Sequence, residues 1–94
     1  MSAQELARKV RAQLEEWDPK LVKFPDTFAI MISARTTKTR ASSMVGRFKL
    51  IIAELADHRP FTIRKRLCSM PPRRREDLAN WDIIVEVPIA QARR

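Results

Sequence analysis

The sequence predicts a small α+β domain in which helices pack on one face of a mostly antiparallel sheet. Apolar residues recur at three- and four-residue spacing in two segments, as in amphipathic helices. Apolar and polar residues alternate in two later segments, as in half-buried strands. At 94 residues the chain is long enough for one domain only. The expected order of elements is helix, strand, helix, strand, strand.

The first helix is expected to begin after Ser2, because Glu5 three residues later completes a capping box that satisfies backbone donors at a helix start. It is expected to end near Asp18-Pro19, since proline cannot continue a helix. One apolar stripe runs along it, made of Ala3, Leu6, Val10, Leu14 and Trp17.

The first strand is expected over 27–33, where β-branched and apolar residues follow the breaker Phe24-Pro25-Asp26. Phe28, Ile30 and Ile32 share one face. Because neither face carries a charge, we expect this strand to be central and covered on both sides, by helices or by a second subunit.

A second helix is expected from about Thr39 to Asp57, because a new apolar stripe begins at Met44. Pro60 then excludes helix, and residues 61–67 alternate as a strand with Thr62, Arg64 and Arg66 on one face. Residues 81–87 alternate again and form the last strand, which Pro88 ends.

A long basic loop, 68–80, joins these last two strands. Pro71-Pro72 stiffens it, three consecutive arginines follow, and Glu76-Asp77-Leu78 is expected to begin one helical turn. Loops of this length inside small domains are uncommon unless they bind something or stay disordered.

The positive charge is concentrated in one part of the sequence. Twelve of the 19 basic residues fall within 34–75, where the only acids are Glu54 and Asp57, whereas the rest of the chain holds seven basic and nine acidic residues. Such a concentration attracts polyanions and displaces their counterions. We expect these cations to converge on a single positive surface that binds nucleic acid.

Segment 34–43 has the composition of a phosphate-binding loop between a strand and a helix. Three cations alternate with five hydroxyls, and a following helix start offers free N–H groups and the positive end of its dipole. In the alternative interpretation, Thr37, Thr39 or Ser42 simply caps the helix. A Walker-type phosphate loop is excluded, because it needs several glycines and the chain has only Gly46.

We therefore expect a nucleic-acid-binding protein that recognises structured or double-stranded RNA through its phosphates, largely without regard to sequence. Arginine outnumbers lysine 13 to 6, and guanidinium groups bind phosphate bidentately and stack on bases. Two alternatives stay open: a protein-interaction adaptor or inhibitor with a basic docking surface, and a duplex DNA binder. The expected contact residues are Arg35, Thr37, Lys38, Arg40, Arg64, Arg66, Arg73, Arg74 and Arg75.

Catalytic and metal chemistry have little support in the sequence. His58 is the only histidine and Cys68 the only cysteine, so clustered metal ligands are lacking. Asp82 and Glu86 share a strand face but lie about 13 Å apart at the usual rise per residue. We expect no enzymatic activity, no cofactor and no small-molecule substrate.

The remaining expectations concern partners and location. A domain this small buries a modest fraction of its surface, so we expect a homodimer. The single cysteine and the lack of a signal peptide or membrane span favour an intracellular, cytoplasmic protein without membrane contact. We expect residues 1–94 to form one nucleic-acid-binding domain, with a flexible end at 89–94.

Overall fold

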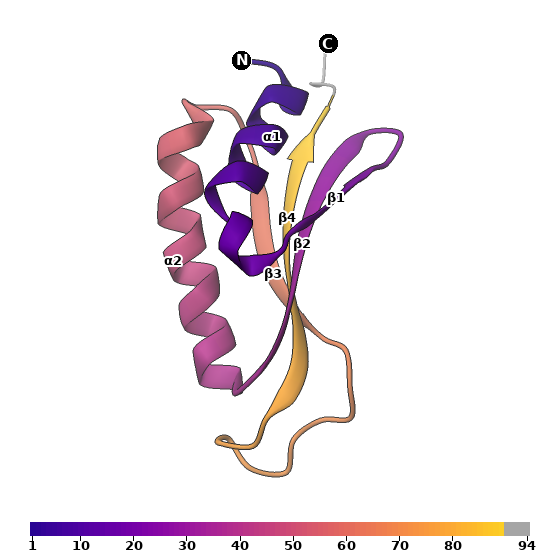
Figure 1. Ribbon diagram of the computed structural model, residues 1–94, viewed down its shortest axis with the longest axis vertical. Helices are drawn as coiled ribbons and strands as arrows, with labels where there is room; N and C mark the ends of the chain where they lie inside the picture. The colour runs from indigo at the N-terminus through magenta and orange to yellow at the C-terminus, as the bar shows by residue number, and fades with distance from the viewer. Residues whose placement is uncertain (90–94) are drawn as a thin grey trace.

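Two helices cover one face of a four-stranded antiparallel sheet in the computed structural model (Figure 1), as the sequence predicts. The structure describes residues 1–89. The sheet order is β1-β2-β4-β3. The elements are α1 (Ala3–Gln13), a 3-10 turn η1 (Glu15–Trp17), β1 (Lys20–Lys23), β2 (Thr27–Thr36), α2 (Lys38–Ala56), β3 (Thr62–Leu67) and β4 (Ala79–Pro88).

The capping box predicted for α1 is present. The Glu5 N–H donates to Ser2 Oγ and the Ser2 N–H donates to Glu5 Oε1, both at 3.1 Å. The helix ends earlier than predicted, at Gln13, and η1 follows. Asp18 then takes a left-handed conformation with φ 54°, which aspartate tolerates better than most residues, and Pro19 prevents the helix from continuing. Trp17 still faces the core, with its ring 5.6 Å from that of Phe48.

Strand β1 is an element that the predicted order lacks. It has four residues, two of them lysines, and pairs with β2 so that Leu21 lies opposite Ile30. A strand this short, with charged ends, leaves too little alternation to be recognised in the sequence. The observed order is therefore helix, strand, strand, helix, strand, strand.

Strand β2 is longer than predicted, since it continues through Ala34 and Arg35 to Thr36. The expected loop over 34–43 is therefore the end of a strand followed directly by the start of α2. Strand β2 is central, as predicted. Helices α1 and α2 lie on the same face of the sheet (Figure 1), so no helix of residues 1–89 covers its other face, and cover by a second subunit stays a prediction. We call the other face, which carries Ser33, Arg66 and Asp82, the open face.

The core lies between the helices and the covered face of the sheet. Leu6 and Val10 of α1 and Phe48 and Ile52 of α2 are at most 1% exposed. The side chains that the sheet contributes alternate along the two central strands, as the period of a half-buried strand requires. They are Phe28, Ile30, Ile32, Ala79, Trp81, Ile83, Val85 and Val87.

The end of β4 is fixed by two contacts. The Ile89 N–H donates to the Asp26 carbonyl, and the Arg59 guanidinium donates to the carbonyls of Pro88 and Ile89 at 3.1 and 3.2 Å. The flexible end predicted for 89–94 stays a prediction, and Ile89 is its only described residue. Its other residues, 90–94, lie outside the described part of the chain.

Phe48→Ala should lower the free energy of unfolding by about 3–5 kcal/mol, because it leaves a cavity under α2. Leu50→Ala on the same helix is the matched control, since Leu50 is 73% exposed, and it should change stability by less than about 0.5 kcal/mol. Urea denaturation followed by circular dichroism measures both. Equal losses in the two variants would contradict the assignment of the buried face.

Candidate nucleic-acid interface

The register between β2 and β4 brings two basic segments to the same end of the molecule. Their last pair is Thr36 with Ala79. From Thr36 the chain enters α2, and Ala79 is reached from the loop that follows β3. Figure 1 shows the start of α2 and this loop together at one end of the molecule, which is 46 Å long. We call residues 35–43 and 68–78 the basic end; it holds six basic and two acidic residues.

The first turn of α2 presents exposed cations and hydroxyls. Thr37 is its N-cap, and its Oγ1 accepts a hydrogen bond of 3.1 Å from the Arg40 N–H. This assigns to Thr37 the capping role that the sequence left open. The first turn contains no acidic residue, so nothing in it offsets the positive end of the helix dipole. Lys38, Thr39 and Ser42 are exposed.

Arg75 of the loop lies beside this helix start. Together with Lys38, Thr39, Ser42 and Ser43 it lines an open hollow of about 450 Å³. A smaller hollow of about 240 Å³ is lined by Thr37, Thr39, Arg75 and Glu76. Residues nearly 40 positions apart in the sequence therefore surround one shallow, polar depression. Its lysine, arginine and hydroxyl groups suit a phosphate.

The loop that carries Arg75 is held by hydrogen bonds at both its base and its turn. The Cys68 N–H donates to the Asn80 carbonyl at 2.8 Å, and the Asn80 N–H donates to Ser69 Oγ at 3.1 Å. Further along, the Arg74 N–H donates to Asp77 Oδ2 at 3.0 Å. This turn takes the place of the helical turn predicted at 76–78.

The three loop arginines differ in their surroundings. The Arg74 Nε lies 3.5 Å from Asp77 Oδ1 and 3.9 Å from Glu76 Oε1, so local carboxylates share its charge. Arg73 and Arg75 are exposed, and neither forms an ion pair with another residue of 1–89. These two are the loop cations best placed to meet an external anion.

The arginines of β3 belong to the open face and are paired with β4. The Arg66 guanidinium lies 2.8 Å from Asp82 Oδ2, and Arg64 Nε lies 3.6 Å from Glu86 Oε1. Asp82 also accepts a hydrogen bond of 2.9 Å from Ser33 Oγ. The predicted convergence of all the cations on a single positive surface is therefore wrong, because these two pairs make the open face one of mixed charge.

Burial of the Asp82 carboxylate works against its charge, but hydrogen bonds led by the one from Arg66 outweigh this, so the pKa of Asp82 is lowered. The Asp82 side chain is 16% exposed. The cluster of Asp82, Arg66 and Ser33 thus joins three strands. It stabilises the sheet that positions the basic end.

The remaining predicted contacts divide between the two faces. Arg35 lies opposite Asn80 in the register, on the open face at the basic end. Arg40 is exposed on α2. Arg59, also within the basic segment of the sequence, is used at the other end of the molecule, where it binds the end of β4 and donates to the Met1 carbonyl at 3.2 Å.

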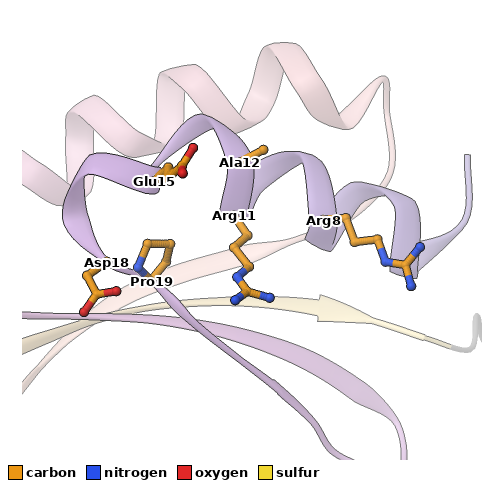
Figure 2. A pocket seen from close by; sticks show the side chains of 6 residues that line it. All are labelled: Arg8, Arg11, Ala12, Glu15, Asp18 and Pro19. Atoms are coloured by element: carbon orange, nitrogen blue, oxygen red, sulfur yellow. The ribbon is translucent and has the colours of Figure 1, made fainter.

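A larger hollow, of about 540 Å³, lies beside α1 (Figure 2). Arg8 and Arg11 line one part of it, and Glu15 and Asp18 line another. Since it carries both signs of charge, it has no preference for a polyanion. In the sequence, the charges of this helix face nearly cancel, so no charge pattern singles it out.

Aromatic side chains are lacking at the basic end. Phe28, Phe48 and Trp81 are buried in the core, and Trp17 packs on Phe48. Phe24 is 47% exposed but lies in the turn between β1 and β2, at the opposite end of the molecule (Figure 1). The basic end therefore offers no aromatic surface on which single-stranded bases could stack.

The residues with catalytic potential are far apart. His58 follows α2 and Cys68 follows β3, so a six-residue strand separates them, and such a strand is about 20 Å long. Within residues 1–89, no three His, Cys, Asp or Glu side chains are grouped closely enough to hold a metal ion. Neither helix in this range has the length and hydropathy of a membrane span.

Comparisons with protein-family models, with curated proteins and with solved structures yield no match for this chain.

Asp82→Asn should destabilise the protein more at neutral pH than in acid. Because the folded-state pKa of Asp82 is lowered, its stabilising effect is present above the unfolded-state pKa and is lost as the pH falls through the folded-state value, below about pH 4. Urea unfolding of both proteins at pH 7 and pH 3 measures this. A difference in stability that is the same at both pH values would count against the Asp82 cluster.

Proposed function

We propose that this protein binds double-stranded or structured nucleic acid, RNA ahead of DNA, through phosphates at its basic end. The observation that carries the proposal is the position of Arg75 beside Lys38 and the hydroxyls at the start of α2. Two basic segments that are distant in the sequence meet there, and neither Arg75 nor Lys38 forms an ion pair with another residue of 1–89.

The contacts follow from the chemistry of this end. Lys38 and Arg75 neutralise a phosphate, and the hydroxyls of Thr39, Ser42 and Ser43 donate hydrogen bonds to its oxygens. The N-terminal end of α2 adds the favourable field of its dipole. Arg35, Arg40 and Arg73 extend this interface along the nucleic-acid backbone, and Arg74 contributes less because it shares its charge with Glu76 and Asp77.

Arg64 and Arg66 have a secondary part in this proposal. Each would have to leave a carboxylate of β4 before it could bind a phosphate. Thr37 also acts indirectly, because its hydroxyl caps α2 and so fixes the direction of the helix start. The central contacts are therefore Lys38 and Arg75.

The residue types at this end favour backbone recognition of a duplex. Aromatic side chains for stacking are lacking there, and arginine, lysine, serine and threonine account for most of its polar groups. Double-stranded RNA is recognised mostly by its shape and by contacts to phosphates and 2′-hydroxyls. The excess of arginine over lysine places RNA first, and duplex DNA is the second ligand to test.

A protein-interaction module is the rival function, and the exposed ring of Phe24 supports it. Phe24 lies in the turn that follows Leu21 and Val22 of β1, at the end opposite the basic end (Figure 1). The two hypotheses therefore predict different effects of a substitution at Phe24. Phe24→Ala should leave RNA binding unchanged and should weaken binding to a protein partner.

We also propose that the protein acts as a homodimer inside the cell, because a 94-residue domain buries a limited core. Light scattering across a range of protein concentrations tests the dimer. A monomer mass at every concentration would overturn this part of the proposal.

The double variant Lys38→Ala, Arg75→Ala should bind duplex RNA more weakly and with less dependence on salt. Each lost phosphate contact should flatten the slope of log affinity against log salt concentration by about 1, so the double variant should lose about 2. The slope is measured by fluorescence anisotropy at increasing potassium chloride.

The matched control is Arg8→Ala, Arg11→Ala. It removes the same charge from the hollow beside α1, whose residues do not belong to the basic end. This control should keep the wild-type slope. The proposed interface would be wrong if both double variants lost slope equally, and the proposed function would be wrong if the wild-type protein bound no nucleic acid at low salt.

A further inference from the structure

The loop at the basic end presents a large apolar side chain to solvent. Met70 is 84% exposed, more than Leu50 at 73% or Leu78 at 56%. Single exposed apolar residues are common on protein surfaces. The position of Met70 is what distinguishes it, because it stands in the same loop as the arginines of the proposed interface, three residues before Arg73.

The backbone around Met70 is held on both sides. Before it, the Ser69 hydroxyl accepts a hydrogen bond from the Asn80 N–H, which lies across the base of the loop. After it, Pro71 and Pro72 restrict the backbone to a narrow range of φ. The loop backbone that carries Met70 therefore loses little conformational freedom when a ligand binds.

We propose that Met70 inserts between bases of an RNA duplex at a point where the helix is already interrupted by a bulge or internal loop. This inference rests on the proposed function, and it names the ligand more narrowly. Three residues span at most about 11 Å, so when Arg73 contacts a phosphate, Met70 lies within reach of the neighbouring bases. Proteins that bind the minor groove of DNA combine arginine contacts with apolar side chains, methionine and proline among them, that enter the base stack.

The interruption is required by the balance of two effects. Unstacking a base step in an intact duplex costs free energy. Burial of one methionine side chain is favourable by a free energy of similar size, so insertion into an intact duplex gains little. In a bulge the stack is already broken. The favourable free energy of burying Met70 is then not cancelled by a cost of unstacking. The protein should therefore prefer an interrupted duplex to a continuous one.

The test compares two probes: a short continuous RNA duplex, and the same duplex with one unpaired adenosine on one strand. Fluorescent 2-aminopurine beside the bulge reports unstacking. The wild-type protein should bind the bulged probe about tenfold more tightly than the continuous one and should raise the 2-aminopurine signal.

Met70→Gln should abolish both the preference and the fluorescence change, and it should keep the affinity for the continuous duplex. Met70→Leu should retain the preference, because leucine is also apolar and of similar size. Leu50→Gln, which alters an exposed apolar residue on α2 away from the loop, should behave as wild type. Thermal melting of each variant confirms that it is folded.

Three other results would each overturn the inference for a different reason. Equal affinity of the wild-type protein for both probes would overturn the insertion of Met70 while leaving backbone binding intact. Binding to neither probe would overturn the proposed function together with this inference. Binding to vesicles of phosphatidylcholine and phosphatidylserine that depends on Met70, without a preference for the bulged probe, would assign the residue to a membrane surface and would also overturn the inference.

Discussion

The antiparallel pairing of β2 with β4 is the interaction on which the rest of the structure depends. It joins ten residue pairs, from Thr27 with Pro88 to Thr36 with Ala79, at the centre of the sheet. One face of this pair supplies most of the sheet's contribution to the core. A slip of one residue would reverse the faces of a strand, and the buried apolar side chains oppose that. Packing of the core therefore fixes the register, and the register fixes which segments meet at the basic end.

The sheet also determines which charges remain available. The pairing of β3 with β4 places Arg66 opposite Asp82. The positive charges of Arg64 and Arg66 on β3 are therefore compensated by carboxylates of β4. At the end of β2 and β4 the chain leaves the sheet, and the cations of α2 and the loop have no carboxylates in a neighbouring strand. The fold thus compensates the arginines of β3 and leaves Lys38, Arg73 and Arg75 without an ion pair in residues 1–89, at one end of a 46 Å molecule.

The sequence predicts the fold better than the site, for a physical reason. Helix α2 is long and strongly periodic, so its position is predicted to within one residue at each end, whereas β1 has four residues and only its neighbour in the sheet defines it. The alternation that puts Arg64 and Arg66 on one face of β3 is local and is confirmed. Their pairing with β4 depends on register across a long loop, which no local pattern encodes. The approach of Arg75 to Lys38 is non-local in the same sense.

Mapping of amide chemical shifts by NMR during titration with duplex RNA tests the central claim most directly. If the basic end binds the duplex, perturbations should be concentrated in residues 35–43 and 68–78, with little change in the turn between β1 and β2. Perturbations centred instead on that turn or on the middle of the open face, or a spectrum that does not change, would contradict the claim that the register of β2 and β4 builds a phosphate-binding end.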